Sequence, residues 1–253
     1  GLIDHSVVAQ GEAAIRARID QLKAEGVRMA VVDAVSNADL LRLGPALKGM
    51  PLVTAGSGVA IGLPGNFGVT PSNEAARLPA AQGLQAIVSG SCSQATNAQV
   101  AHFIAGGGVA HVLDPLRLAR DRAGAVAEAL ALAEAQLPSG PVLIYSTAEP
   151  MAVAAVQAQL GTEGAGALVE QALAEVAQGL LRLGVRQLVV AGGETSGAVV
   201  QALGVRQMQI GPQIDPGVPW CHAFGNDGPL HLALKSGNFG SDDFFTKAFA
   251  QLA

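Results

Sequence analysis

The strongest constraint on the fold is a regular alternation of two kinds of segment. From residue 84 onward, short apolar β-type runs alternate with longer Ala- and Leu-rich runs whose apolar residues recur at helical spacing. Such alternation predicts an α/β fold with a mostly parallel sheet and helices on both of its faces. A TIM barrel is disfavoured, because it needs about eight such units in one uninterrupted series.

Periodicity and turn residues set the expected elements. The expected strands cover residues 29–34, 51–55, 84–89, 108–114, 141–147, 186–192, 206–214 and 230–237. The expected helices cover residues 11–25, 38–47, 94–105, 115–137 (as one helix or two), 149–160, 167–184, 194–204 and 242–252. Ser36 and Asn37 are expected to cap the second of these helices. Residues 217–229 are so rich in turn-forming types that we expect an irregular connection there.

A change of composition divides the chain. Residues 64–82 hold three prolines together with Gly, Asn and Ser, and they show little periodicity. That combination is typical of a boundary between domains. We therefore expect one domain to end and a second to begin within this segment.

Charge and cysteine content argue against several classes of protein. The 15 Lys and Arg against 20 Asp and Glu leave a net charge of −5, which argues against a nucleic-acid partner or an anionic membrane surface. Residues 78–113 carry no charge but contain too many Gln, Ser, Thr and Asn residues for a spanning helix. The two cysteines, Cys92 and Cys221, make no disulfide framework, so a reducing compartment such as the cytoplasm is expected.

Familiar catalytic and cofactor motifs are missing from the sequence. It has no Walker A loop, no HExxH and no CxxC, and the Gly-rich run 56–62 has the wrong spacing for a dinucleotide fingerprint. The five histidines lack the spacing of metal ligands, so we expect no structural metal site.

Three Gly-rich turns at expected strand ends remain as candidate sites. The first turn, 89–94, supplies backbone N–H groups and hydroxyls at a helix N-terminus, where an anion such as a phosphate is favoured. A plain turn with a serine cap is the competing interpretation. The candidate residues of this turn are Ser89, Gly90, Ser91 and Ser93.

The second turn, 191–197, also joins an expected strand to an expected helix. Its glycines permit positive φ angles or a close backbone approach. Glu194 would either orient a Mg²⁺-bound water or simply favour the helix N-terminus. The candidate residues of this turn are Gly192, Gly193, Glu194 and Thr195.

The third turn, 235–243, begins with Lys235, one of four lysines in the chain. A lysine beside a Gly-rich turn is a natural phosphate partner. A solvated strand end followed by a helix cap has the same pattern, so both interpretations stand. The candidate residues of this turn are Lys235, Ser236, Gly237, Asn238, Phe239 and Gly240.

The three turns are expected to converge on one ligand, because the carboxyl ends of parallel strands share one edge of a sheet. A phosphate-bearing ligand, most simply a nucleotide, fits them best. Its base would be held mainly by aliphatic side chains, because aromatic residues make up 4% of the chain. Cys92 offers a rival interpretation as a thiol nucleophile, which needs a histidine partner that the sequence does not place. A non-catalytic nucleotide-binding module is a second alternative.

Six segments resemble the four-carbon acid sugar kinase family, in order along nearly the whole chain. They are GLIDHS…VVDAVSNADL (1–40), PLVTAGSGVAIGLP (51–64), IVSGSCSQATNAQV (87–100), LVVAGGETSGAVVQAL (188–203), IGPQIDPGVPW (210–220) and LALKSGNFGSDDFF (232–245). The last segment looks most like the branch that phosphorylates 3-oxo-tetronate. The threonate and erythronate branches are close alternatives.

The resemblance implies a two-domain α/β enzyme that transfers phosphate from ATP, with Mg²⁺, to the terminal hydroxyl of a four-carbon sugar acid. It also implies a division of the chain. Residues 1–68 would be the C-terminal part of a sugar-binding domain, residues 69–82 a linker and residues 83–253 a nucleotide-binding domain.

By motif, the resemblance assigns ATP contacts to Ser91, Gly193 and residues 237–240. On the sugar side, Ser57 and Gly58 are candidate binding residues, with a plain turn as the alternative. A homodimer is an expectation from the family. The acidic DDFTGA-type motif that opens the family's sugar domain is absent, so we expect this chain to be a fragment without the catalytic base.

Overall fold

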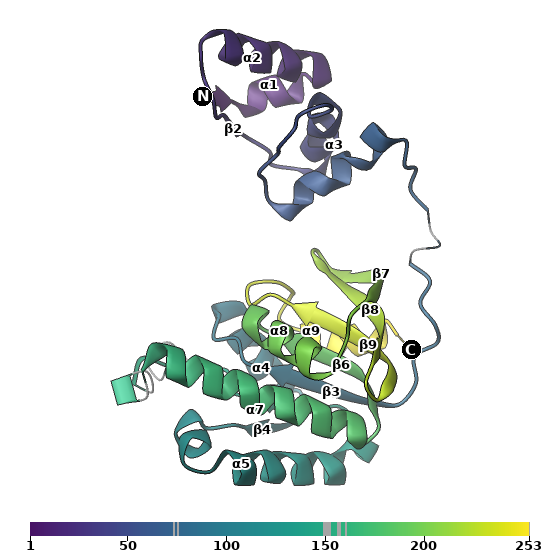
Figure 1. Ribbon diagram of the computed structural model, residues 1–253. Coiled ribbons are helices and arrows are strands. Elements are labelled where there is room, and N and C mark those ends of the chain that lie inside the picture. The colour runs from purple at the N-terminus through teal and green to yellow at the C-terminus, as the bar shows by residue number, and fades with distance from the viewer. Residues whose placement is uncertain (73, 75, 149–152, 156–157, 160, 253) are drawn as a thin grey trace. The chain divides into compact units, whose positions relative to one another are not determined.

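The computed structural model describes residues 1–253 except 73, 75, 149–152, 156, 157, 160 and 253 (Figure 1). The chain forms two compact units, residues 1–72 and residues 73–253. Each unit has a hydrophobic core of its own.

The first unit combines short helices with a two-stranded parallel sheet. Its elements are β1 (Leu2–Ile3), α1 (His5–Ala9), α2 (Glu12–Ala24), β2 (Val31–Val32), α3 (Asn37–Ala46) and the 3₁₀ helices η1 (Ser57–Gly62) and η2 (Pro64–Phe67). The predicted helix 11–25 is confirmed as α2. The predicted cap is confirmed too, since the Asp39 N–H donates to the Ser36 Oγ at 3.3 Å. Gly44 lets α3 meet η1 backbone to backbone, because a Cβ there would lie 1.9 Å from the Gly62 carbonyl oxygen.

Two predicted strands of this unit are wrong. Residues 29–34 form only the two-residue strand β2, in which Val31 is 69% exposed rather than buried. Residues 51–55 form no strand. A strand persists only where a neighbour pairs with its backbone groups. β1 offers two residues to β2, and no described segment pairs with residues 51–55.

The second unit is built on a seven-stranded sheet in the order β4–β5–β3–β6–β9–β8–β7. Its strands are β3 (Leu84–Ser89), β4 (Val109–Val112), β5 (Val142–Tyr145), β6 (Val185–Ala191), β7 (Met208–Asp215), β8 (Val218–Gly225) and β9 (Gly228–Lys235). The five neighbouring strands β4, β5, β3, β6 and β9 run parallel to one another. β8 pairs antiparallel with both β9 and β7. The predicted α/β class with a mostly parallel sheet is confirmed.

Helices cover both faces of this sheet (Figure 1). One face carries α4 (Gln94–Ala105) and α9 (Phe244–Ala250), and the other carries α5 (Pro115–Gln136), α7 (Thr162–Arg182) and α8 (Gly193–Ala202). The 3₁₀ helix η3 (Leu137–Ser139) follows α5. In β3, Ala86 and Val88 enter the core with α5, α7 and α8, whereas Ile87 between them enters the core with α4 and α9. This alternation makes β3 a central strand, buried from both sides.

The segment predicted to be irregular, residues 217–229, is instead most of the β8–β9 hairpin. Gly225 pairs with Gly228, so only Asn226 and Asp227 turn the chain. A two-residue loop is enough for a hairpin. Trp220 in β8 is fully buried, which shows that this segment belongs to the core.

Three further predictions concern helices. α5 is two helical pieces joined at the non-helical Asp121, as the prediction of one helix or two allowed. α9 begins at Phe244 rather than at Asp242, and Asp243 makes no side-chain cap. The predicted helix 149–160 lies mostly outside the described residues.

Candidate functional site

A cavity of about 660 Å³ lies at the carboxyl ends of β3, β4, β5, β6 and β9. The turns that follow these five strands form one part of its wall, and residues of α7 form another. The lining residues used below are Gly90, Ser91, Cys92, Val112, Leu113, Asp114, Ser146, Thr147, Val169, Glu170, Gly192, Gly193, Glu194, Thr195, Ser236 and Gly237.

The cavity lies where the sheet topology reverses. β3 and β6 are neighbours, but the chain leaves β3 through α4 toward β4 and leaves β6 through α8 toward β7. These two connections run to opposite edges of the sheet. In open α/β sheets, ligands bind at the carboxyl ends of strands at such a point.

Backbone hydrogen bonds tie the first two predicted turns together. The N–H groups of Gly90 and Ser91 donate to the Ala191 carbonyl at 3.0 and 3.2 Å, and the Gly192 N–H donates to the Lys235 carbonyl at 2.8 Å. Glycine is required at residue 90, because a Cβ would lie 2.3 Å from the Thr195 Oγ1. The structure therefore brings the turns after β3, β6 and β9 to one place.

The cavity wall carries backbone N–H groups without a partner. The first N–H groups of a helix have no intrahelical acceptor, and the other turns contribute further free donors. None of these N–H groups has an acceptor among the described residues; they belong to Cys92, Gly193, Glu194, Thr195 and Gly237. Free N–H groups and the positive end of α8 together favour a bound anion.

Part of the lining is apolar. Val112 ends β4, Leu113 follows it, and Val169 belongs to α7. Such a surface suits a flat, weakly polar group more than a second anion. The lining thus combines free N–H groups, which suit phosphates, with apolar side chains, which suit an apolar ring.

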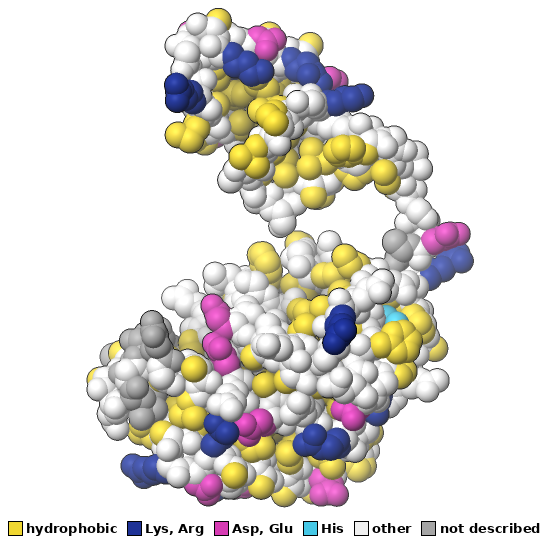
Figure 2. All heavy atoms as spheres, viewed as in Figure 1, with side chains coloured by type: hydrophobic (Ala, Val, Ile, Leu, Met, Phe, Trp, Pro, Cys, Tyr) yellow, Lys and Arg dark blue, Asp and Glu magenta, His cyan; other side chains and the backbone are white. Residues whose placement is uncertain are grey.

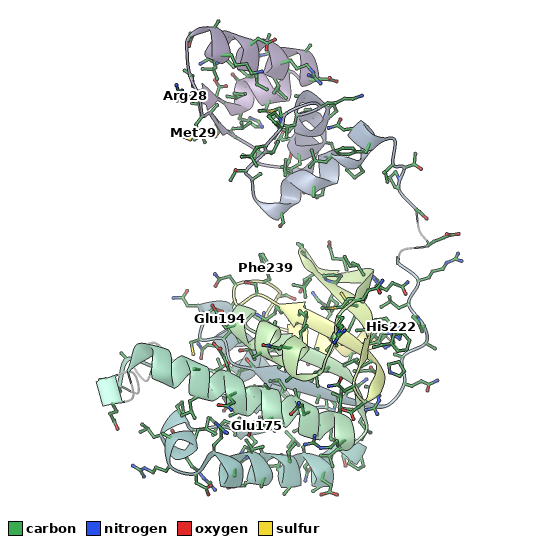
Figure 3. The ribbon with its side chains drawn as sticks, in the orientation of Figure 1. Arg28, Met29, Glu175, Glu194, His222 and Phe239 are labelled. Atoms are coloured by element: carbon green, nitrogen blue, oxygen red, sulfur yellow. The ribbon has the colours of Figure 1, made fainter. Side chains whose placement is uncertain are left out.

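Three carboxylates also line the cavity. Asp114 caps α5 by accepting from the Leu116 N–H at 2.9 Å. Burial, and next the negative charge of Glu194, raise the pKa of Glu170 above its ordinary value. Figure 3 labels Glu194 at the start of α8. Within the described part of the chain, no group of three or more His, Cys, Asp and Glu side chains is placed to hold a metal ion by itself.

The third turn is only partly at the cavity. Ser236 and Gly237 line it, whereas Asn238, Phe239 and Gly240 do not. The Phe239 ring, labelled in Figure 3, is 45% exposed.

The structure places three other predicted residues, Lys235, Ser89 and Ser93, outside the cavity lining. Lys235 is fully buried behind the third turn. The Ser89 hydroxyl is buried 2.7 Å from the Thr147 Oγ1. Ser93 caps α4 by accepting from the Thr96 N–H at 3.1 Å.

The remaining predictions concern the sugar side and the thiol. Ser57 and Gly58 lie at the start of η1 in the first unit. Cys92 lines the cavity, but no histidine is among the described lining residues, so the partner that a thiol nucleophile needs is not found there.

Sequence reasoning missed the residues after β4 and β5. The carboxyl ends of parallel strands share one edge of the sheet, and β4 and β5 belong to its parallel part. The same reasoning would therefore have placed Asp114, Ser146 and Thr147 at the cavity. Glu170 lies inside the long helix α7, where nothing in the local sequence distinguishes it from other exposed-face carboxylates.

Two further surfaces complete the description. A second cavity of about 410 Å³ beside the β8–β9 hairpin is lined by His222, Phe224, His231 and neighbouring residues, and holds none of the predicted site residues. On the face of the second unit in Figure 2, the Lys and Arg side chains are scattered singly. None of the described helices is both long and apolar enough to span a membrane.

The fold and the cavity define an α/β domain built to hold a phosphate-bearing ligand, and comparison with known proteins agrees. A family described as the nucleotide-binding C-terminal domain matches residues 86–245. A second, described as the sugar-binding N-terminal domain, matches residues 1–63. The chain belongs to the four-carbon acid sugar kinase family.

Individual relatives share both sequence and fold. The 3-oxo-tetronate kinase of Pseudomonas fluorescens is 54% identical over 256 residues, which cover all of this chain and 59% of that protein. A Salmonella typhimurium LT2 crystal structure, described as a putative tRNA synthase, has a TM-score of 0.78 at 40% identity, covering 99% of this chain and 59% of that one. A Haemophilus influenzae structure has a TM-score of 0.73 at 36% identity, covering 100% and 60%. The chain thus spans about three-fifths of the length of these relatives.

Proposed function

We propose that this chain carries the nucleotide site of an ATP-dependent kinase that phosphorylates the terminal hydroxyl of a four-carbon sugar acid, 3-oxo-tetronate. The observation that carries the proposal is the cavity whose lining combines free N–H groups from three turns with apolar side chains. The relatives named 3-oxo-tetronate kinase supply the choice of acid. Threonate and erythronate are the alternative substrates.

In this proposal the ATP phosphates lie against the backbone of the three turns, and the adenine lies against the aliphatic wall. Little covalent chemistry is required of the protein in phosphoryl transfer, so positioning and charge stabilisation dominate. The cofactor-binding residues are Gly90, Ser91, Gly192, Gly193, Glu194, Thr195, Ser236 and Gly237, with Ser89, Ser93, Asn238, Phe239 and Gly240 supporting the turns.

The donor set fits a Mg²⁺ ion that arrives with the nucleotide. Mg²⁺ is commonly held by one or two carboxylates, substrate phosphates and waters rather than by a complete protein cage. Glu194 and Glu170 line the cavity beside the phosphate-binding turns, and the charge of Glu194 already raises the pKa of Glu170. Glu194 would hold the ion through water, with Glu170 second. When bound, the ion neutralises charge on the phosphates.

The two units take different roles in this proposal. Residues 83–253 form the nucleotide-binding domain and residues 69–82 the linker. Residues 1–68 belong to the sugar-binding domain, where Ser57 and Gly58 are the candidate contacts at η1. A homodimer stays a prediction, which light scattering would test.

Calorimetric titration of this chain with Mg-ADP tests the nucleotide site. One-to-one binding at micromolar strength supports the proposal, and no binding up to millimolar nucleotide contradicts it for this chain.

Turnover is tested on the full-length protein with ATP and 3-oxo-tetronate, threonate or erythronate. Phosphate transfer that is fastest to 3-oxo-tetronate supports the proposal. Nucleotide binding without transfer to any of the three acids would favour a non-catalytic nucleotide-binding module instead. The Cys92→Ser variant should keep its activity, because a kinase needs no thiol nucleophile.

A further inference from the structure

Lys235 is a buried cation that has no counter-charge among the described residues. Its side chain is fully buried at the end of β9. Its Nζ donates to the Thr96 Oγ1 at 3.0 Å and to the carbonyls of Ser236 and Gly237 at 3.2 and 2.9 Å. All three acceptors are neutral, and Lys235 makes no ion pair with any described carboxylate. A buried charge without a partner is costly, so its presence calls for an explanation.

Side chains along one face of α4 hydrogen-bond to the third turn. Ser93, Thr96 and Gln99 follow at intervals of three residues, so they lie along one side of the helix. The hydroxyls of Ser93 and Thr96 donate to the Gly237 carbonyl at 2.6 and 2.9 Å. The Gln99 Nε2 donates to the carbonyls of residues 239, 240 and 241 at 3.0, 3.0 and 3.1 Å.

These contacts orient the peptide groups of the turn. The Gly237 carbonyl accepts from Lys235, Ser93 and Thr96 on the side of α4. Gly237 lines the cavity, and its N–H has no acceptor among the described residues. A larger residue there would displace the Ser91 hydroxyl, since a Cβ would lie 2.5 Å from the Ser91 Oγ. The donors behind the turn therefore leave its N–H groups available to a ligand in front.

We propose that Lys235 is a positioning residue that orients the third turn from behind, and that the phosphates of the bound nucleotide supply the counter-charge its ammonium lacks. The proposal deepens the nucleotide site and rests on it. Lys235 then acts on the phosphates across the Gly237 peptide, without touching them. This differs from the direct phosphate contact that the sequence suggested.

The proposal predicts that nucleotide binding and the charge of Lys235 are coupled. Burial lowers the pKa of Lys235 from its ordinary 10.5 to about 8 in the free protein. The groups that face its ammonium from α4 and from the turn are a hydroxyl and two carbonyls, and none of them titrates. Bound phosphates favour the protonated form, so binding raises this pKa and takes up a proton at alkaline pH.

Proton uptake is measured by titrating the chain with Mg-ADP in buffers of different ionisation enthalpy. From a pKa of about 8, we expect up to about 0.7 proton per nucleotide at pH 8.5 and under about 0.1 at pH 7. Equal uptake at both pH values, or none at pH 8.5 despite binding, overturns the proposal.

The variant Lys235→Met gives the second readout. Methionine keeps an unbranched side chain but has no charge, so the uptake at pH 8.5 should vanish and affinity should fall by about tenfold or more. Lys23→Met, an exposed lysine of the first unit, is the matched control and should change neither quantity. Unchanged affinity and uptake in Lys235→Met overturn the proposal while leaving the nucleotide site intact. Failure of the parent chain to bind nucleotide would instead overturn both.

Discussion

At the scale of single residues, Gly193 is the sharpest probe of the site. A Cβ there would meet no protein atom within 4 Å, and its φ is not positive, so a side chain is tolerated by the fold. Gly193 lines the cavity, however, and the new side chain would occupy ligand space. We expect Gly193→Val to weaken Mg-ADP binding by about tenfold or more, roughly 1.4 kcal/mol, as measured by calorimetry.

The matched control is Gly197→Val on the same helix. Gly197 is exposed, equally open to a Cβ and not part of the cavity lining. The nucleotide affinity of Gly197→Val should match that of the parent chain. Equal affinity in both variants would show that the α8 N-terminus does not hold the phosphates.

The burial of Lys235 also makes stability depend on pH. Folding lowers its pKa from 10.5 to about 8, so between these values the unfolded chain binds more protons than the folded one. Stability therefore rises with pH across this window, by an amount on the order of 3 kcal/mol from this group. Urea unfolding without nucleotide at pH 7.5 and at pH 10 should show that rise in the parent chain, and a smaller one in Lys235→Met. An equal rise in stability with pH in the parent chain and in Lys235→Met would contradict the assignment of this effect to Lys235.

At the scale of elements, α4 is both a core helix and the support of the third turn. Replacing Gln99 by Leu leaves the carbonyls of residues 239–241 without their buried donor. We expect Gln99→Leu to lower the free energy of unfolding by about 2–3 kcal/mol. Gln94→Leu, at an exposed position of the same helix, should stay within about 0.5 kcal/mol. Denaturant unfolding measures the stability of both variants. An equal loss of stability in Gln99→Leu and Gln94→Leu would contradict the role of Gln99 in supporting the third turn.

Elements with strong local patterns could be predicted from the sequence, whereas pairings between distant segments could not. β3 and α4 have the predicted bounds, because a buried apolar run and a serine-capped helix carry their own signals. The strand predicted at 230–237 largely matches β9, but β8 was missed because its Gly and Pro residues outweighed the alternation around Trp220. The three turns could be placed at one sheet edge from topology alone. The burial of Lys235 depends on how α4 packs against the sheet, and no local sequence pattern indicates that packing.

At the scale of the whole molecule, two units with separate cores should respond separately to nucleotide. Ligand present at about 100 times its Kd stabilises the domain that binds it by about 2.7 kcal/mol. Differential scanning calorimetry should show Mg-ADP raising the transition of residues 73–253 while leaving that of residues 1–72 in place. An isolated 73–253 chain serves as the control that assigns the transition. If Mg-ADP raised only the transition of residues 1–72, the nucleotide would bind to that unit, which contradicts the proposed site.

The central claim is that free backbone N–H groups at the ends of β3, β6 and β9 hold the phosphates of a nucleotide. An amide-resolved NMR titration of this chain with Mg-ADP tests it most directly. We expect the largest shifts at the N–H groups of Cys92, Gly193, Glu194, Thr195 and Gly237. Largest shifts at the second cavity, around His222 and Phe224, or no shifts at the three turns, would contradict the account.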